Sequence, residues 1–175
     1  MAEDALIGCG LVGGVLLEQR DFDHVYTRQN AQAMRGKHFG TVYCAAMPGT
    51  KWLANSQPEP DMANVLALAS LLDSVKAEQF VLISTVDVFE RPVGVDEHSR
   101  AFAESAYGRH RLMLEWMVRS RFKRHLVVRL PGLVWPTLAK GPLYDLRHDH
   151  RVSELSASST YQWYRANDGS GAGAA

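Results

Sequence analysis

Three glycines near the N-terminus limit most strongly what this chain can fold into. Gly8, Gly10 and Gly13 follow a short apolar run, residues 5–7, and open a helical stretch, residues 11–19. The first glycine permits a tight turn, the second lets the backbone approach a phosphate, and the third lets helix and strand pack closely. Free N–H groups and the helix dipole then favour an anion. The motif predicts a turn that binds dinucleotide phosphates, with a purely structural glycine turn as the alternative.

Short apolar runs and helical stretches alternate through most of the chain. The expected strands are residues 5–7, 24–27, 41–46, 80–83 and 125–130, and the expected helices are residues 11–19, 61–76 and 103–119. This alternation predicts parallel strands joined by right-handed crossovers, in a sheet covered on both sides. We therefore expect an α/β fold, a Rossmann-type doubly wound parallel sheet. Asp61 is expected to be the N-cap of the long helix.

The regular pattern ends before the chain does. We expect residues 1–139 to form one dinucleotide-binding domain, long enough to bury its own core. Residues 140–165 lose the periodicity, and residues 166–175 are a glycine- and alanine-rich tail that is expected to be mobile.

The composition argues against several classes of partner. Lysine plus arginine and aspartate plus glutamate both number 19, so the formal net charge is zero, which argues against a general nucleic-acid binder. No apolar run approaches the roughly 20 residues that span a bilayer, and the acidic N-terminus is unlike a signal peptide. We expect a cytoplasmic protein without a membrane partner. Its two cysteines, Cys9 and Cys44, are expected to be buried free thiols.

Other catalytic motifs are missing or incomplete. The chain has no Gly-x-Ser-x-Gly elbow, and Gly49 and Lys51 lack the spacing of a P-loop. A metal site at His148 and His150 is set aside because neighbouring residues do not easily converge on one ion, so we expect no metal and a solvated loop there.

The residues after the second expected strand bear on the choice of cofactor. An NAD site usually offers an acid there for the ribose 2′-hydroxyl, but residues 25–30 contain none. Arg28 is suited to pair with a 2′-phosphate. The segment favours NADP over NAD, and a solvated arginine at a strand end is the alternative.

Two motifs in the second half of the chain add chemistry to this pattern. "STVDVF" at residues 84–89 ends an expected strand, and "YGRHR" at residues 107–111 begins an expected helix. Further support comes from "CAA" at 44–46, Asn64 and "RLPGLVWP" at 129–136. In this order and spacing, from about Ala5 to Pro136, the chain resembles the extended short-chain dehydrogenase/reductase family, specifically its NAD-dependent epimerase/dehydratase group, which acts on nucleotide sugars.

The resemblance implies roles for three residues. Tyr107 matches the general acid/base, Thr85 matches the hydroxyl that binds the reacting oxygen, and Arg111 stands where the family has lysine. A fixed cation one helical turn away stabilises a phenolate and lowers the pKa of the tyrosine. Arginine keeps the charge but essentially never deprotonates. We expect Arg111 to hold the nicotinamide ribose but not to join a proton relay.

The resemblance also implies the cofactor site. Its expected members come from the glycine turn, from the ends of several strands and from the tyrosine helix: Gly8, Gly10, Leu11, Val12, Gly13, Arg28, Ala45, Ala46, Tyr107, Arg111 and Pro131.

Departures from the family pattern refine the expectation. Asp87 keeps one acid of the dehydratase pair and Val86 replaces the other, which favours epimerase or reductase chemistry over dehydration. The short span between residues 30 and 40 implies a sheet reduced by a strand. Residues 140–165 are expected to be a remnant of the substrate lobe, in which residues 159–164 resemble the start of a late strand. Both a truncated and a minimal family member fit these departures.

The helices at 61–76 and 103–119 are apolar over more than one stripe. In the resembling family these helices pair with their copies, which implies a homodimer; an ordinary monomer core is the alternative. Our first hypothesis is an NAD(P)-dependent epimerase or reductase acting on a nucleotide-activated sugar. The second is a non-catalytic NAD(P)-binding sensor or partner-binding module, and the third is a remnant without stable function.

Overall fold

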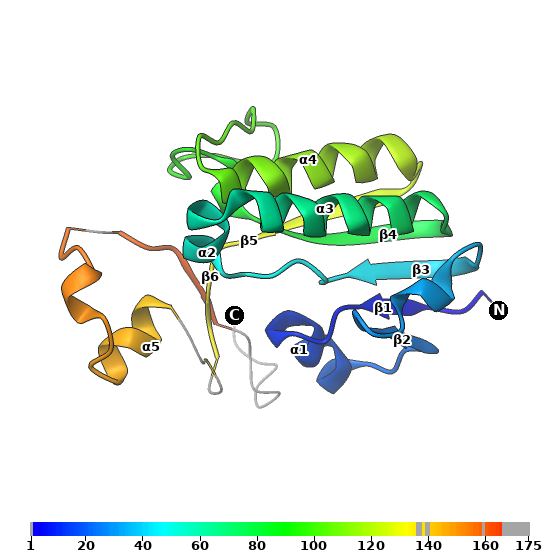
Figure 1. Ribbon diagram of the computed structural model, residues 1–175, viewed down its shortest axis with the longest axis horizontal. Coiled ribbons are helices and arrows are strands. Elements are labelled where there is room, and N and C mark those ends of the chain that lie inside the picture. The colour runs from blue at the N-terminus through cyan, green and yellow to red at the C-terminus, as the bar shows by residue number, and fades with distance from the viewer. Residues whose placement is uncertain (1, 136–137, 139–140, 159, 166–175) are drawn as a thin grey trace, which may run out of the picture. The chain divides into compact units, whose positions relative to one another are not determined.

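The computed structural model describes residues 2–135, 138, 141–158 and 160–165 (Figure 1). The chain divides into two compact units, residues 1–129 and 130–175, and each is described here by itself. No helix in the described ranges has both the length and the apolar character needed to cross a membrane.

A five-stranded sheet with the order β2-β1-β3-β4-β5 is the centre of the first unit. The strands are β1 (Ala5–Ile7), β2 (His24–Tyr26), β3 (His38–Cys44), β4 (Lys76–Thr85) and β5 (His125–Leu130). β1 pairs in parallel with both β2 and β3, and β3 pairs in parallel with β4. This is the Rossmann-type α/β fold, and the expected fold class is confirmed. Between β2 and β3 lies only a 3₁₀ turn, Ala31–Met34, so the sheet is reduced by a strand as expected.

The helices lie on both faces of this sheet. They are α1 (Leu11–Gln19), α2 (Lys51–Ser56), α3 (Pro58–Asp73) and α4 (Ala106–Arg121), and a 3₁₀ turn, η2 (Val86–Val88), follows β4. The chain passes from β1 to β2 in one direction and from β3 to β4 in the other. Right-handed crossovers therefore place α1 on the face opposite α3 and α4. The reversal between β1 and β3 is the place where such sheets bind ligands, beside the carboxyl ends of the strands.

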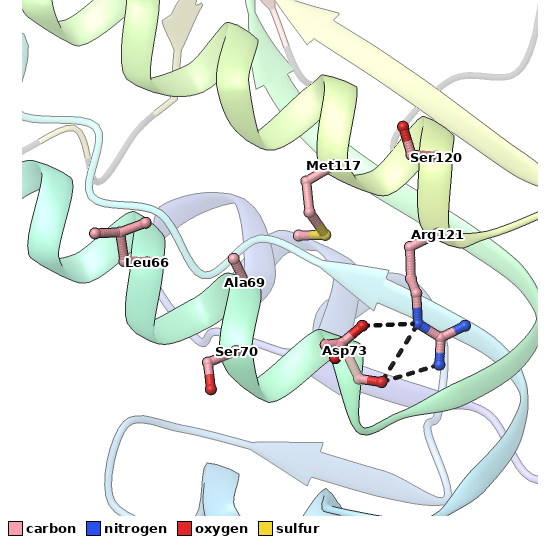
Figure 2. A pocket seen from close by; sticks show the side chains of 7 residues that line it. All are labelled: Leu66, Ala69, Ser70, Asp73, Met117, Ser120 and Arg121. Carbon is pink, nitrogen blue, oxygen red and sulfur yellow. Dashed lines mark hydrogen bonds and ion pairs between the residues drawn. The ribbon is translucent and has the colours of Figure 1, made fainter.

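α3 and α4 lie side by side, and their apolar faces cover the sheet (Figure 1). Val65 and Leu72 of α3 and Leu114 of α4 are fully or almost fully buried in the main core together with Phe80 of β4. At the far end of the two helices Arg121 donates to the carbonyl oxygen of Asp73 and pairs with its carboxylate (Figure 2). These contacts hold α3 and α4 together along their length.

A buried carboxylate links α4 to two strands. Glu115 is completely buried and accepts hydrogen bonds from Ser84 at 2.6 Å and from Arg129 at 2.7 and 3.1 Å. Because an unpaired charge is costly in a core, this bridge ties α4 to β4 and β5 in one register.

Several expected boundaries shift in the structure. The expectation that Asp61 caps the long helix is wrong: Gln57 is the N-cap, and α3 starts at Pro58. Proline suits the first helical position because its fixed φ angle matches the helix and its missing N–H is not needed there. α4 likewise starts at Ala106, after the cap Ser105.

β3 and β4 are longer than expected at their amino ends. His38 pairs with Lys76, Phe39 with Ala77 and Thr41 with Gln79, in a stretch where polar and apolar residues are mixed. Cross-strand pairing therefore extends both strands into polar segments whose residue types do not by themselves indicate a strand. The helix α2 is also additional, since residues 51–56 carry no strong periodic signal.

The second unit has its own small parallel sheet, formed by β6 (Gly132–Val134) and β7 (Trp163–Arg165). It also contains α5 (Pro142–Arg147) and a 3₁₀ turn at Val152–Glu154. β7 overlaps the late strand expected at residues 159–164. Pro136, Ser159 and the tail 166–175 lie outside the described residues, so the expected mobility of the tail stays a prediction.

Two adjacent glycines of α1 provide a matched stability test of the turn. A Cβ atom on Gly13 would lie 1.9 Å from the Gly8 carbonyl oxygen, whereas one on Gly14 would meet nothing within 4 Å. We expect Gly13→Ala to destabilise the fold by about 1–3 kcal/mol through overpacking. Gly14→Ala is expected to stabilise it by about 0.5–1 kcal/mol, as alanine does in a helix. Urea unfolding of both variants measures the difference, and equal effects would contradict the close helix–strand contact.

Candidate functional site

The three glycines of the N-terminal turn differ in what surrounds them. Gly8 has a φ angle of +94°, and a Cβ there would lie 2.6 Å from the Ala45 carbonyl oxygen. Gly13 is equally closed because it packs on Gly8, but a Cβ on Gly10 would meet nothing within 4 Å. The outer glycines therefore serve the packing, and the middle one faces open space at the N-cap of α1. A pyrophosphate fits this arrangement, since the first N–H groups of a helix have no partner inside it.

Four other expected cofactor residues of the first unit lie around this turn. Gly8 donates its N–H to the Tyr26 carbonyl at 2.8 Å, and Ala45 donates to the Ile7 carbonyl at 2.8 Å. Ala45 and Ala46 thus border the turn, while Leu11 and Val12 form the first helical turn after it.

Arg28 is exposed two residues beyond β2. The nearby amide of Asn30 fixes the chain at the end of this strand, since its oxygen accepts from the Thr27 N–H at 2.6 Å. No acid lies among residues 25–30, so the arginine is the charged group at this strand end. Its pairing with a phosphate stays a prediction.

The two cysteines occupy different environments. Cys44 ends β3 and is buried as expected, and burial raises the pKa of its thiol to about 11. The expectation for Cys9 is wrong, because Cys9 is exposed. It lies inside the glycine turn, where the backbone is open rather than covered by a neighbouring strand.

Close packing at Gly108 brings Tyr107 to the end of β4. A Cβ on Gly108 would lie 2.2 Å from the Asp87 carbonyl oxygen, so only glycine lets α4 approach the η2 turn this closely. Ser105 caps the helix by accepting from the Gly108 N–H, and Asn55 of α2 accepts from the Tyr107 N–H at 2.9 Å. The expected pair of Thr85 and Tyr107 is thereby brought together.

Tyr107 is 7% exposed and lies beneath the guanidinium of Arg111, whose Cζ is 4.3 Å from the ring centroid. The two residues are one helical turn apart, as their spacing predicts. Burial raises the pKa of the Tyr107 phenol above its ordinary value, and the Asp87 carboxylate raises it further, although Arg111 and Thr85 act in the opposite direction. The phenol of Tyr107 is therefore protonated at neutral pH.

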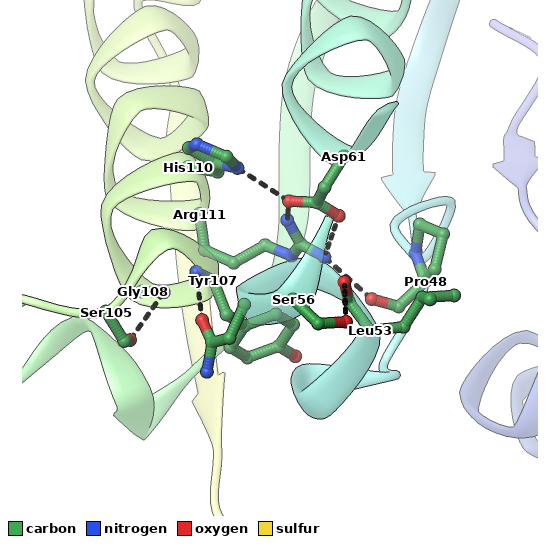
Figure 3. Close-up of polar contacts among 10 residues, drawn as sticks. Pro48, Leu53, Ser56, Asp61, Ser105, Tyr107, Gly108, His110 and Arg111 are labelled. Atoms are coloured by element: carbon green, nitrogen blue, oxygen red, sulfur yellow. Dashed lines mark hydrogen bonds and ion pairs between the residues drawn. The ribbon is translucent and has the colours of Figure 1, made fainter. Parts of the chain in front are cut away.

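Arg111 is held by an ion pair that the sequence did not reveal. Its guanidinium contacts both carboxylate oxygens of Asp61, at 2.8 and 3.0 Å, and donates to the Pro48 carbonyl at 2.7 Å (Figure 3). His110 contacts the same carboxylate at 2.7 Å. Arg111 and Asp61 are both nearly fully buried. The guanidinium expected to act on Tyr107 is thus also paired with Asp61.

The carboxylate of Asp61 depends on these partners. Burial alone would raise its pKa, but the hydrogen bonds and charges of Arg111 and His110 hold the pKa below its ordinary value. The position of Asp61 on the apolar face of its helix is the sequence signal that could have pointed to a cationic partner elsewhere in the chain, because buried acids are rarely left unpaired.

A second ion pair lies on the other side of Thr85. The hydroxyl of Thr85 donates to one oxygen of Asp87 at 3.2 Å and accepts from the Asp87 N–H at 3.1 Å. The other oxygen of Asp87 accepts from the ammonium of Lys51 at 2.6 Å. Lys51 comes from α2, so its proximity to Asp87 is a property of the tertiary structure.

The remaining expected residues lie elsewhere. Pro131 belongs to the second unit, between β5 and β6, and its role toward a cofactor stays a prediction. His148 and His150 are exposed. Across the described residues no group of three or more histidines, cysteines, aspartates or glutamates is placed to hold a metal ion.

Three solved structures illustrate what this chain is similar to. The dTDP-4-dehydrorhamnose reductase of Bacillus anthracis, solved with NADP, matches 77% of this chain at 22% identity and a TM-score of 0.62. A UDP-galactose 4-epimerase matches 93% of the chain at 16% identity and a TM-score of 0.69. The UDP-glucuronic acid 4-epimerase of Bacillus cereus, solved with NAD, matches 84% at 14% identity and a TM-score of 0.65.

These likenesses establish the shared fold, in agreement with the resemblance drawn from the motifs. The matched parts make up 55%, 67% and 63% of the three neighbours, so the chain spans little more than half of the reductase. No family model and no curated protein matches the chain.

Two aspartates of α3 form a matched pair for testing the buried network. Asp61 meets Arg111 in the interior, whereas Asp73 meets Arg121 at the surface, with its side chain 82% exposed. We expect Asp61→Asn to cost about 3 kcal/mol, because it leaves Arg111 buried without a counter-charge. Asp73→Asn is expected to cost less than about 1 kcal/mol. Urea unfolding at pH 7 tests both, and similar losses would contradict the structural role of Asp61.

The same pair carries a pH dependence. Since the pKa of Asp61 is lowered in the folded protein, its stabilisation is complete above the ordinary value of 3.8 and is lost as the pH falls through the lower folded value. The stability difference between wild type and Asp61→Asn should therefore shrink in acid.

Proposed function

We propose that this chain is the cofactor-binding part of an NAD(P)-dependent epimerase or reductase that acts on a nucleotide-activated sugar. One observation carries the proposal. Gly10, which has open space beside it, lies between two tightly packed glycines at the N-terminus of α1, at the carboxyl ends of the strands, where β4 ends in Thr85. The groups for phosphate binding and for proton transfer thus both lie at the carboxyl ends of the strands of one sheet. The enzymes of this fold described above support the substrate class.

The cofactor is NADP or NAD. Gly10 and the N–H groups of Leu11 and Val12 would hold the pyrophosphate, and Ala45 and Ala46 would border the adjoining ribose. Arg28 supports NADP, because a guanidinium pairs well with a 2′-phosphate and no acid lies nearby to receive a 2′-hydroxyl.

The bound nicotinamide would take or return a hydride. Tyr107 would move a proton to or from the sugar hydroxyl, and the Thr85 hydroxyl would orient the reacting oxygen. Burial in the first turn of α4 keeps the phenol out of water. The single acid Asp87, in place of a dehydratase acid pair, supports epimerisation or reduction.

A second candidate function is a non-catalytic NAD(P)-binding sensor or partner module. It is favoured by the pKa of Tyr107, which burial and Asp87 raise above the ordinary value although Arg111 acts in the opposite direction. Such a module would keep the glycine turn but have no turnover.

Removal of one phenolic oxygen tests the first candidate. We expect Tyr107→Phe to reduce turnover by about a hundredfold or more, since it removes the group that transfers the proton. The rise in melting temperature on adding NADPH should be unchanged in this variant. Turnover is followed with UDP-galactose as the epimerase probe and with a dTDP-4-keto sugar plus NADPH as the reductase probe.

Tyr43→Phe is the matched control, because the Tyr43 hydroxyl accepts from Arg20 and has no part in the proposed site. Retained turnover in Tyr107→Phe would refute the assignment. A cofactor-induced shift without any turnover in the wild type would favour the sensor module.

We also propose that the chain forms a homodimer through α3 and α4. The two helices border a groove whose walls include Leu66, Ala69 and Met117 (Figure 2). Leu66 is 56% exposed and Trp116 is 59% exposed, although both lie on helices whose other faces are in the core. Exposed apolar side chains at a groove of this kind support an association between copies.

Introducing a negative charge on this face tests the dimer. We expect Leu66→Glu and Trp116→Glu to yield monomers, because each would place a carboxylate in an apolar interface. Sedimentation velocity measures the mass. Val93→Glu is the control, since Val93 is 85% exposed in a loop outside both helices. A monomeric wild type would refute the proposal.

A further inference from the structure

The charge around Tyr107 is arranged differently from what the arginine in its helix suggests. Arg111 lies over the ring, but its guanidinium is shared with both oxygens of Asp61 and with the Pro48 carbonyl. Burial and the Asp87 carboxylate raise the pKa of the phenol above its ordinary value, although Arg111 lowers it by its charge and by a hydrogen bond. A second cation that offsets Asp87 would favour loss of the proton.

The polar chain on the opposite side of Tyr107 ends in such a cation. Thr85 faces the phenol and donates to Asp87 at 3.2 Å, and Asp87 accepts from Lys51 at 2.6 Å. Lys51 is half-exposed, and the Asp87 carboxylate is partly exposed. The pair thus lies between the phenol and solvent, within reach of ions and ligands.

The sign of each charge determines what the pair does. The Asp87 carboxylate disfavours a phenolate at Tyr107, and by pairing with Asp87 the Lys51 ammonium offsets this effect. The charged groups in question are Arg111 and His110 of α4, Asp61 of α3, Asp87 of η2 and Lys51 of α2. Arg111 is paired with Asp61, so Lys51 is the cation that offsets Asp87.

We propose that Lys51, acting through Asp87 and Thr85, is the positioning residue that offsets the carboxylate charge beside Tyr107 and so complements Arg111. The inference rests on the proposed role of Tyr107 in proton transfer. Lys51 acts on the tyrosine through its neighbours, so removing its charge makes the tyrosine hold its proton more tightly.

A titration of residue 107 in the free protein tests the proposal without substrate or cofactor. 3,5-Difluorotyrosine is placed at position 107 by genetic encoding, because its phenol ionises near neutral pH, where lysine stays charged. Fluorine NMR then follows its ionisation. We expect Lys51→Met to raise the apparent pKa by about half a unit, a roughly threefold gain in proton affinity. Lys51→Arg keeps the charge and should leave the pKa unchanged.

The remaining variants complete a double-mutant cycle. Asp87→Asn should lower the pKa, and the double variant Lys51→Met/Asp87→Asn should return it close to the wild-type value. Lys123→Met is the control for net charge, since Lys123 is exposed after the end of α4. It should leave the titration unchanged.

Three results would overturn the inference. Lys51→Met and Lys51→Arg could behave alike, Lys51→Met could shift the pKa no more than Lys123→Met, or the pKa could fall in Lys51→Met because water enters a loosened site. If Asp87→Asn does not fold, the comparison of the two Lys51 variants still decides. Because the titration needs no turnover, a protein without enzymatic activity would refute the proposed function and leave this measurement readable.

Discussion

The buried ion pair between Asp61 and Arg111 is the interaction on which the arrangement of the site depends. It joins α3 to α4, and through the Pro48 carbonyl it also holds the loop that follows β3. A buried charge without its partner costs several kcal/mol, so neither helix can shift far without exposing the other's charge. The first turn of α4 is therefore placed firmly against the end of β4, where Thr85 and Tyr107 meet.

The glycine turn and the surroundings of Tyr107 depend on different interactions. The glycine turn depends on close backbone packing between Gly8, Gly13 and Ala45, and none of these contacts involves Arg111. The pKa of Tyr107 depends on burial and on the charges around it, of which Arg111 lowers the pKa and Asp87 raises it. The pairing of Lys51 with Asp87 is therefore part of the same balance of charges.

The order of the elements was predictable because it is written in local patterns. The strand at residues 5–7, the helix at 11–19 and the strand at 125–130 occur where the apolar runs and glycines indicate. Errors arose where neighbours in space override local preference. His38 and Lys76 belong to strands because they pair with each other. Asp61 lies inside a helix that begins at Pro58, and its carboxylate meets Arg111 of another helix instead of capping its own.

The sequence by itself determined the glycine turn, the parallel α/β order and the spacing that brings Arg111 beside Tyr107, because each follows from residues close together in the chain. Only the tertiary structure decided which charges meet. Asp61 lies 50 residues before Arg111, and Lys51 lies 36 residues before Asp87. Their contacts arise from the way α2, α3 and α4 pack on the sheet, and no local periodicity encodes which side chains of different helices approach within hydrogen-bonding distance.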